Sequence, residues 1–342
     1  MIPPPFMTAS RHIAIREAWL AQHREPVLDP GLPIIDPHHH IWDQVDQRYL
    51  LPELQADTAT GHDIRATVFI QCSAQYDMAE PPERRPLGET RFMTQVAEAA
   101  AGAPTRACAG IVGLVDLTLG DRVTPLLEAH VAAAGGRFRG VRNRTAWDAS
   151  AALRSNLESP PPGPLGLPEF RVGARRLAAM GLTLDVWAYH PQLPLLLEVA
   201  RAVPELTIIV DHCGGPLGLG PYRRDAIFAE WHASILALST CPNVMMKLGG
   251  LAMDVGGYDF HQHPLPPNSA TLAEVWRPTI EACIAAFGVQ RCMFESNFPV
   301  DKGMCSYPVL WNAFKRLAVG ASPDERRALF SDTAARVYRL DV

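Results

Sequence analysis

The chain has 342 residues, of which 48% are hydrophobic and 20% are charged, and its formal net charge is −5. These proportions are typical of a globular protein with a large core. The sequence shows neither the basic stripe of a nucleic-acid-binding protein nor an apolar run of about 18 residues that would cross a membrane. We therefore expect a small-molecule substrate, with no nucleic acid or membrane as partner.

The seven cysteines are scattered, with no Cys-x-x-Cys, which favours free thiols in a reducing cytoplasm over a disulfide framework or a thiolate zinc site. The first residues lack the apolar core of a signal peptide, which also favours a cytoplasmic protein. Residues 9–24 predict an N-terminal helix with Ser10 as its cap. We expect this helical extension to occupy residues 1–30 and a single catalytic domain to occupy residues 31–342.

From residue 34 onward, short apolar runs alternate with helical patterns. Eight runs predict strands, namely Ile34–His40, Thr67–Gln71, Cys108–Asp116, Phe138–Arg142, Leu182–Trp187, Leu206–Asp211, Val244–Leu248 and Cys292–Ser296. Helices are predicted between them, for example over Glu89–Ala101, Leu193–Val203 and Leu272–Phe287. Eight such units favour an α/β fold, a (β/α)₈ TIM barrel, over an open sheet, which the sequence leaves as an alternative. No Gly-x-Gly-x-x-Gly turn follows the first strand, which argues against dinucleotide binding.

Two Pro- and Gly-rich segments, residues 149–169 and 252–271, are longer than ordinary connections. Each follows a predicted strand and precedes a predicted helix. In a barrel, such loops lie at the carboxyl ends of the strands, where active sites are built. We expect them to be lids or substrate-selecting loops. His261 and His263 lie in the second segment with no strand behind them, so we expect them in a solvated loop.

The stretch "IIDPHHHIWD" places three histidines at the end of the first predicted strand. In an extended chain, successive side chains point to opposite faces, so His38 and His40 share a face with Asp36, and His39 points away. Two imidazoles two residues apart can reach one metal ion or one substrate. The alternative is a histidine cluster without chemistry.

Polar residues recur at the ends of the other predicted strands, where an apolar core needs none. Each of them also has an ordinary structural explanation. Asp211 could cap a helix, Arg142 could form a structural ion pair, and His190 could lie in a surface turn. The set comprises Gln71, Arg139, Arg142, Tyr189, His190, Gln192, Asp211, His212, Lys247, Glu295, Asn297 and Asp301.

The stretches "IIDPHHHIWD", "FRGVRN", "LDVWAYHPQL", "VDHCGGP" and "CMFESNFPVDK" occur in an order and spacing that resemble one family. This family is the amidohydrolase-superfamily branch of TIM-barrel hydrolases related to 2-pyrone-4,6-dicarboxylate lactonase and sugar lactonases. The likeness runs from about residue 31 to the terminal "DTAARVYRL". It implies a distorted (β/α)₈ barrel, often one divalent metal, and hydrolysis of lactones or related carboxyl derivatives.

The resemblance also implies roles for individual residues. His38, His40 and His212 match family histidines and become the candidate metal ligands, for zinc or manganese. Arg142 matches the arginine of the family's Gly-Val-Arg, which can hold a carboxylate bidentately. Further candidates for substrate contact are Gln71, Trp42 and Tyr189.

The chain departs from the family at the eighth strand. Where the family commonly has Gly-Ser-Asp-Trp-Pro, this sequence has Glu295-Ser296-Asn297-Phe298-Pro299. Asn297 cannot act as a general base and is a weaker ligand than the Asp it replaces. Glu295, on the same face if the strand stays extended, or Asp301, in the following loop, could replace the lost carboxylate, and Glu89 is a more distant alternative.

The leading hypothesis is a lactonase in which a metal, or the histidines alone, polarises the lactone carbonyl. Glu295 or Asp301 then takes the proton of the attacking water, and His212 or His190 stabilises the oxyanion. The alternatives are a metal-dependent decarboxylase of an aromatic or unsaturated acid and a non-catalytic small-molecule binder. The outer helices are compatible with a homodimer, which no sequence feature specifies.

Overall fold

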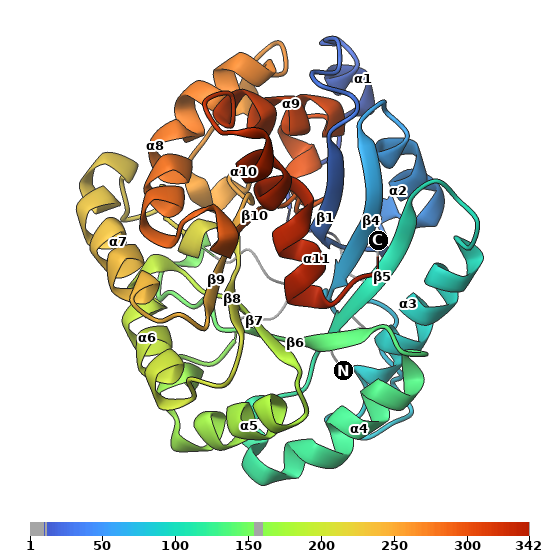
Figure 1. The fold of residues 1–342 in the computed structure, drawn as a ribbon, viewed down its shortest axis with the longest axis vertical. Coiled ribbons are helices and arrows are strands. Elements are labelled where there is room, and N and C mark those ends of the chain that lie inside the picture. The colour runs from blue at the N-terminus through green and yellow to red at the C-terminus, as the bar shows by residue number, and fades with distance from the viewer. Residues whose placement is uncertain (1–9, 11, 154–159, 342) are drawn as a thin grey trace.

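The computed structural model describes residues 10, 12–153 and 160–341, and its eight parallel strands form a nearly closed barrel (Figure 1). Neighbouring strands pair in the order β1-β4-β5-β6-β7-β8-β9-β10. A parallel bridge between His39 and Phe298 joins β1 to the segment after β10 and closes the barrel. The strands are β1 Pro33–His39, β4 Asp63–Ile70, β5 Arg106–Gly113, β6 Phe138–Arg144, β7 Thr183–Trp187, β8 Ile208–Val210, β9 Val244–Leu248 and β10 Cys292–Phe294.

Helices surround the barrel, because each parallel strand must return to the same end of the sheet through a crossover (Figure 1). A short antiparallel hairpin, β2 Trp42–Gln44 and β3 Gln47–Tyr49, follows β1. The helices are α1 Glu17–Leu20, α2 Leu51–Thr58, α3 Leu87–Ala99, α4 Thr124–Ala133, α5 Pro168–Ala179, α6 Leu193–Ala202, α7 Arg224–Ser239, α8 Ser269–Phe287, α9 Tyr307–Leu317, α10 Pro323–Arg327 and α11 Thr333–Tyr338. None of these described helices is long and apolar enough to cross a membrane.

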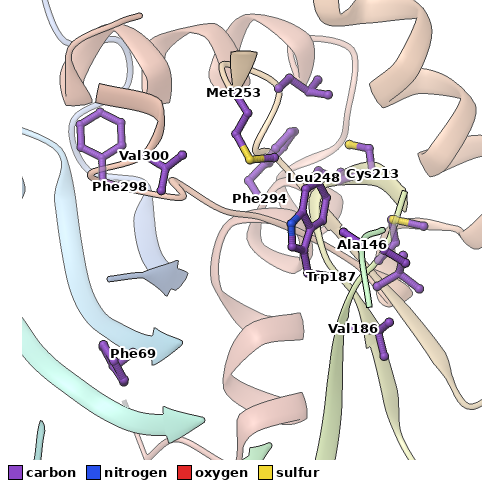
Figure 2. Packing of buried hydrophobic residues seen from close by; sticks show 14 of the residues in the cluster. Phe69, Ala146, Val186, Trp187, Cys213, Leu248, Met253, Phe294, Phe298 and Val300 are labelled. Atoms are coloured by element: carbon purple, nitrogen blue, oxygen red, sulfur yellow. The ribbon is translucent and has the colours of Figure 1, made fainter. Parts of the chain in front are cut away.

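The hydrophobic core has two parts. The larger part lies between the strands and the surrounding helices and reaches the barrel mouth, where Trp187, Met253 and Val300 belong to it (Figure 2). The smaller part fills the barrel interior and includes Ile35 of β1 and Met245 of β9. Strand β9, "VMMKL", is buried at all five positions, which explains why four of its five residues are apolar, Lys247 being the exception.

Helix α11 packs across one end of the barrel (Figure 1). Its residues Ala334, Val337 and Tyr338 belong to the interior part of the core, together with residues early in β1 and β9. The helix therefore covers the amino-terminal ends of the strands. The opposite, carboxyl-terminal end, here termed the barrel mouth, carries the long loops.

The predicted barrel and all eight predicted strands are confirmed, and β9 has the predicted bounds. The predicted helix over residues 9–24 is wrong, because only Glu17–Leu20 is helical among the residues of this range that the structure describes. Ser10 caps no helix; its backbone N–H donates to Asp46 Oδ1 at 2.7 Å. The backbone carbonyl of Ile13 accepts a hydrogen bond from the Gln47 side chain at 3.5 Å. These contacts with the hairpin hold the segment in a non-helical path, and the domain division at residue 31 stays a prediction.

Both long segments follow a strand and precede a helix, as predicted. The first lies between β6 and α5, and its residues 154–159 are outside the described part of the chain. The second lies between β9 and α8 and contains two short 3₁₀ turns, Asp254–Gly256 and Phe260–Gln262. All seven cysteines are free, and only Cys72 is not fully buried.

Candidate active site

Glu295 joins two histidines at the barrel mouth. One carboxylate oxygen, Oε2, lies 2.7 Å from His38 Nδ1, and the other, Oε1, lies 2.7 Å from His212 Nδ1. Oε1 also accepts the backbone N–H of His212 at 3.0 Å. All three residues are buried, and the centroids of the two imidazole rings lie 4.5 Å apart. Because a carboxylate only accepts hydrogen bonds, it fixes the protons of both rings on Nδ1 and leaves each Nε2 with a lone pair.

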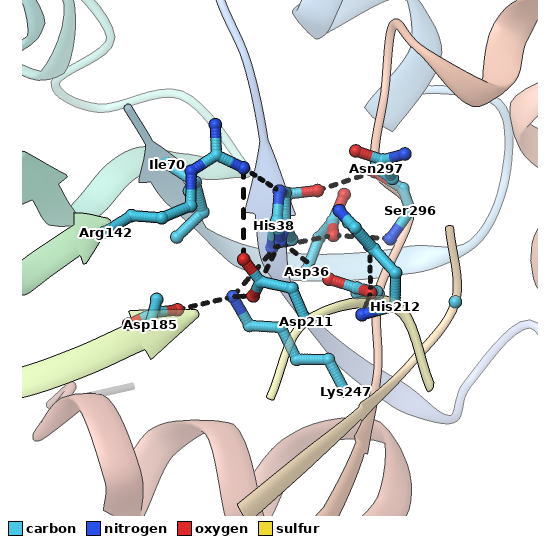
Figure 3. A network of polar contacts seen from close by, with 12 residues as sticks. Asp36, His38, Ile70, Arg142, Asp185, Asp211, His212, Lys247, Ser296 and Asn297 are labelled. Atoms are coloured by element: carbon cyan, nitrogen blue, oxygen red, sulfur yellow. Dashed lines mark hydrogen bonds and ion pairs between the residues drawn. The ribbon is translucent and has the colours of Figure 1, made fainter. Parts of the chain in front are cut away.

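A second group of charges lies beside this cluster, in the barrel interior. The ammonium of Lys247, on β9, contacts Asp185 at 2.7 Å and Asp211 at 3.1 Å (Figure 3). It also lies 3.2 Å from His38 Nδ1. Tyr338 of α11 donates to the same Asp185 oxygen at 2.6 Å. Lys247 therefore connects the histidine cluster to the helix that covers the far end of the barrel.

Arg142, near the end of β6, faces the cluster from the side opposite Lys247 (Figure 3). Its guanidinium lies 3.5 Å from His38 Nε2 and 3.9 Å from Asp211 Oδ2, and it donates to the backbone carbonyl of Gln71. The guanidinium nitrogen Nε has no hydrogen-bond partner among the described residues. Two of its five N–H donors are thus directed at the protein, and the side chain also lines the cavity described below.

The positions of these charges set the protonation states of the cluster. Burial, with Lys247 nearby, lowers the pKa of His38 well below its usual value, and Glu295 opposes this only in part. Burial alone would raise the pKa of Glu295, but contacts with His212 and His38 outweigh it and hold the pKa far below its usual value. Burial likewise opposes ionisation of Asp211, yet Lys247 and the other cations keep its pKa low. The cluster consequently contains two fixed anions and a neutral His38.

His40 faces the cavity at the barrel mouth. Its Nδ1 lies 2.8 Å from the carbonyl oxygen of Ile70, so Nδ1 carries the proton and Nε2 carries the lone pair. The ring stacks on Trp42, with centroids 5.7 Å apart. Burial, together with Arg142, lowers the pKa of His40 well below its usual value and keeps the ring neutral.

A cavity opens above these residues, with an empty volume of about 650 Å³ that includes its open mouth. Its described lining contains two arginines and no carboxylate. The side chain of Arg144, the second of them, forms no hydrogen bond or ion pair with any described residue. The lining comprises His12, His40, Trp42, Gln44, Cys72, Ser73, Arg142, Arg144, Trp187, His212, Met253, Asn297 and Val300. Its charge therefore suits a ligand that is neutral or negative.

Asn297 reaches this cavity, and Asp301 lies behind it. The loop after β10 folds back, so that Asn297 Nδ2 donates to Asp301 Oδ1 at 2.7 Å. The second oxygen of Asp301 accepts the backbone N–H of Ala252 at 3.1 Å. Burial raises the pKa of Asp301 to about 7. Asp301 does not line the cavity, and so its link to the cavity runs through Asn297.

Asp36 and His39 do not join the cluster. Asp36 accepts hydrogen bonds from the backbone of Ser296 and from the Tyr307 hydroxyl, both at 3.0 Å, and thereby braces the end of β10. His39 points away from the cluster, as predicted, and contacts the Thr67 hydroxyl at 2.8 Å. The predicted face shared by Asp36, His38 and His40 is interrupted, because the pairing register of β1 shifts between Asp36 and His39.

Three other candidates lie away from the cavity lining. The Gln71 amide donates to Ser73 and Tyr76, at 3.2 and 3.0 Å. Tyr189 donates its hydroxyl proton to the carbonyl of Leu153 at 2.7 Å. His190 packs its ring against Tyr222, and its Nδ1 accepts the backbone N–H of Leu217 at 3.4 Å. These contacts correct the placement expected for Gln71, Tyr189 and His190, since each holds a loop and none lines the cavity.

Glu89, the more distant carboxylate, also holds a loop. Its Oε1 accepts the backbone N–H groups of Cys72 and Ala74, at 3.1 and 2.7 Å. Burial raises its pKa to about 7. The folded protein thus binds this proton more tightly than the unfolded chain does. The resulting stabilisation is complete at low pH and is lost as the pH rises from about 4.5 to about 7.

We expect Glu89→Gln to remove this part of the pH dependence. The variant amide can still accept both backbone hydrogen bonds but cannot ionise. Relative to the wild type, its free energy of unfolding should rise between pH 5 and pH 8 by up to about 3 kcal/mol. Urea titrations at several pH values measure this difference. Glu98→Gln, at an exposed position of the same helix, is the control, and a parallel pH dependence of Glu89→Gln and wild type would contradict the prediction.

Two consecutive glycines after β9 make room for the cluster. A Cβ atom on Gly249 would lie 2.5 Å from Glu295 Cγ, and one on Gly250 would lie 2.3 Å from His212 Nδ1. Gly250 also has a positive φ of 64°. Both contacts are far closer than real Cβ atoms allow, so only glycine fits beside these two side chains.

Gly250→Ala is expected to displace the His212 imidazole. The free energy of unfolding should fall by about 1–3 kcal/mol, and a ring moved by about 1 Å should lower turnover about 100-fold. Gly102→Ala is a matched control, because Gly102 has φ 84° and open space around its Cβ position. Chemical denaturation and turnover are the two measurements. An active Gly250→Ala enzyme with unchanged stability would show that the ring tolerates the methyl group.

The polar residues identified at strand ends from the sequence include Asp211 and Lys247, without an assigned role. They do not include Asp185, Arg144 or His12. Asp185 is a carboxylate in the otherwise apolar strand "TLDVW", which is itself an indication of a buried partner. Arg144 lies two residues beyond Arg142 on the same strand, a spacing that places both on one face. No pattern in the sequence indicated His12.

The cluster has the donors of a divalent-metal site. His38, Asp211 and His212 each offer a ligand atom, and these atoms lie within 4.8 Å of one another. His40 is outside this set, and its role as a ligand stays a prediction, whereas Asp211 was not among the predicted ligands. Asp211 offers an ionised carboxylate that Lys247 contacts at 3.1 Å, and Glu295 engages the Nδ1 atoms of both histidines. A carboxylate on the outer nitrogen is the usual arrangement of metal-binding histidines, so the residues fit such an ion.

Comparisons with known proteins agree with this architecture. The Amidohydrolase family model matches residues 35–340. An uncharacterised protein of Sinorhizobium fredii, y4mH, is 34% identical over 331 residues, which span 90% of this chain and 99% of the relative. The L-fucono-1,5-lactonase of Burkholderia multivorans is 26% identical, over 90% of this chain and 96% of the lactonase.

Among solved structures, an amidohydrolase from Burkholderia multivorans with bound zinc matches with a TM-score of 0.69 and 26% identity. The match covers 90% of this chain and 99% of that chain. The family match spans nearly the whole barrel, from β1 to α11. The protein is therefore a member of the amidohydrolase family.

Proposed function

We propose that the protein is a lactonase that opens a carboxylate- or hydroxyl-bearing lactone at the barrel mouth. The observation that carries this proposal is the pairing of His38 and His212 through Glu295, beside a cavity whose described lining has two arginines and no carboxylate. A neutral ring that becomes a carboxylate on opening suits such a lining. The similarity to L-fucono-1,5-lactonase over nearly the whole chain supports the same reaction class.

The proposal includes one divalent metal, zinc or manganese, which His38, Asp211 and His212 would hold. When bound, such an ion polarises a substrate carbonyl as a Lewis acid. Glu295 is assigned a positioning role, since it keeps the Nδ1 side of both rings engaged. This differs from the role of general base considered from the sequence, because both Glu295 oxygens face the histidine rings and Glu295 does not line the cavity.

The chain's other residues supply substrate binding and proton transfer. Arg144, with no partner among the described residues, is free to bind an anionic or hydroxyl group of the substrate. Trp187 lines the cavity and offers apolar surface to the lactone ring. His40 carries its lone pair on Nε2, beside the cavity, and is the proposed acceptor for the proton of the attacking water. Asn297 provides an amide for the carbonyl or the alcohol that leaves.

The test is product chemistry. The purified protein is assayed with L-fucono-1,5-lactone, with a carboxylate-bearing lactone, and with a panel of aromatic hydroxy acids, while acid release and carbon dioxide release are followed together. Acid release from a lactone, lost in Arg144→Ala and His40→Ala but retained in His23→Ala, is the expected result. Carbon dioxide release from an aromatic acid would replace the lactonase by a decarboxylase. Binding of lactones without turnover would replace it by a small-molecule binder.

A further inference from the structure

We propose that Ser10 and residues 12–20, here termed the N-terminal strap, form a fixed wall of the cavity, and that His12 on this strap restricts the enzyme to monocyclic substrates. His12 lies before residue 35, where the match to the family begins. It nevertheless lines the same cavity as His40 and His212. The substrate class, a monocyclic lactone, rests on the proposed function, whereas the wall itself rests on the contacts described below.

The strap is attached first to the β2–β3 hairpin. The backbone N–H of Ser10 donates to Asp46 Oδ1 at 2.7 Å, and the Ser10 hydroxyl donates to Gln47 Oε1 at 3.3 Å. The Gln47 amide in turn donates to the Ile13 carbonyl at 3.5 Å. These hydrogen bonds hold both sides of His12 against the hairpin that carries Trp42.

The strap is also attached to the loop after β10. Ile13 packs so closely on Gly303 that a Cβ atom there would lie 2.6 Å from Ile13 Cβ. Glu17 contacts the ammonium of Lys302 at 2.9 Å, and Lys302 also binds Asp57 at 3.0 Å. Lys302 is almost fully buried, which makes this a more persistent contact than an exposed ion pair.

The third attachment is to the long loop between β9 and α8. Arg16 donates to the backbone carbonyl of His261, and Trp19 Nε1 donates to the carbonyl of His263 at 3.1 Å. Trp19 and Leu20 are buried, so the strap ends in residues shielded from solvent. His261 and His263 lie in a loop, as predicted, and the His263 side chain is exposed. Their backbone carbonyls hold the strap in place.

At the centre of the strap, the His12 ring stacks on Trp42, with centroids 5.5 Å apart and planes within 10°. Burial, with Arg142 nearby, lowers the pKa of His12 to about 4, so the ring is neutral and presents a flat, uncharged surface. The His12 ring fills space beside Trp42 at the edge of the cavity. A substrate with a second fused ring would need that space. Specificity of this kind comes from steric exclusion.

The first test measures the wall without relying on catalysis. Cys72 lines the cavity and is the only one of the seven cysteines that is not fully buried, so it reports access to the cavity. N-ethylmaleimide labelling of Cys72 is followed by peptide mass spectrometry in the wild type, His12→Ala, His12→Phe and His23→Ala. His12→Phe keeps a ring on Trp42, and His23→Ala removes an imidazole from the same region outside the cavity.

We expect Cys72 in His12→Ala to react roughly tenfold faster, because the wall loses the ring that closes it, while the other two variants match the wild type. Equal labelling of His12→Ala and wild type would overturn the proposal. Equal acceleration in His23→Ala would also overturn it, because the effect would then be general loosening. A Cys72→Ser protein confirms that labelling occurs at this residue.

The second test measures specificity, with L-fucono-1,5-lactone as the monocyclic substrate and dihydrocoumarin as the bicyclic one. In His12→Ala the ratio of kcat/KM for the bicyclic over the monocyclic lactone should rise roughly tenfold, equivalent to about 1.4 kcal/mol. An unchanged ratio would overturn the assignment of specificity to His12. Faster labelling of Cys72 without hydrolysis of any lactone by the wild type would retain the wall and reject the lactonase.

Discussion

Replacing Glu295 by Gln is expected to weaken metal binding and turnover together, each by roughly 10- to 100-fold. The Glu295 carboxylate lies 2.7 Å from the Nδ1 atoms of both His38 and His212, and it accepts a hydrogen bond from each ring. A glutamine has one oxygen and one NH₂ group, so it can accept from only one ring. The other imidazole must move its proton to Nε2 and thereby lose the lone pair with which it would bind a metal ion.

The measurements are the zinc dissociation constant, by competition with a chelator, and kcat/KM for the preferred lactone. Glu198→Gln is the matched control, because that side chain lies on the surface in an ion pair with Arg171. Circular dichroism verifies that Glu295→Gln folds. Wild-type zinc affinity in Glu295→Gln would contradict the positioning role. Unaffected zinc affinity with turnover lowered about 1,000-fold or more would favour a direct role in proton transfer.

Replacing Lys247 by Met is expected to lower the free energy of unfolding by about 3–5 kcal/mol, the usual effect of breaking a buried ion pair. The Lys247 ammonium is fully buried and is the nearest cation to Asp185, at 2.7 Å, and to Asp211, at 3.1 Å. Burial favours the neutral form of this lysine, but the two carboxylates outweigh burial and raise its pKa. Without the ammonium, both carboxylates lose their principal counter-charge.

The double variant Lys247→Met/Asp185→Asn separates charge from packing. Removal of one carboxylate together with the lysine should recover part of the lost stability, so the two single effects should not add. Urea unfolding of the wild type, the two single variants and the double variant gives the coupling energy. Full stability of Lys247→Met would contradict the prediction. Additive losses would show that the methionine disturbs packing and not charge balance.

The placement of the principal histidines could be predicted because it follows from topology. Carboxyl ends of parallel strands in a barrel meet at one end, so His38 near the end of β1 and His212 after β8 had to approach each other, although they are 174 positions apart in the sequence. The alternation rule also placed Glu295 near this cluster. The rule assumed an extended strand from Glu295 to Asn297. In the structure, β10 ends at Phe294, and Asn297 has a positive φ of 54°.

The remaining parts of the site depend on contacts that local patterns do not encode. The prediction of a helix over residues 9–24 assumed that local helix propensity determines the backbone conformation there. In the structure, hydrogen bonds with the hairpin hold Ser10 and Ile13. Tyr189 and His190 occupy a strand end like the true cluster members, but their hydrogen bonds are with neighbouring loops. Residue type and strand position alone cannot distinguish a side chain that faces the cavity from one that braces a loop.

The hydrogen bond between Tyr338 and Asp185 has a kinetic consequence. It joins residues 153 positions apart, and its formation requires both a complete β7 and the docking of α11. Contacts across such long loops are entropically costly to close, so they form late in folding. Interactions absent from the transition state act mainly on the unfolding rate. The Lys247 network should therefore lengthen the lifetime of the folded barrel while leaving the speed of its formation nearly unchanged.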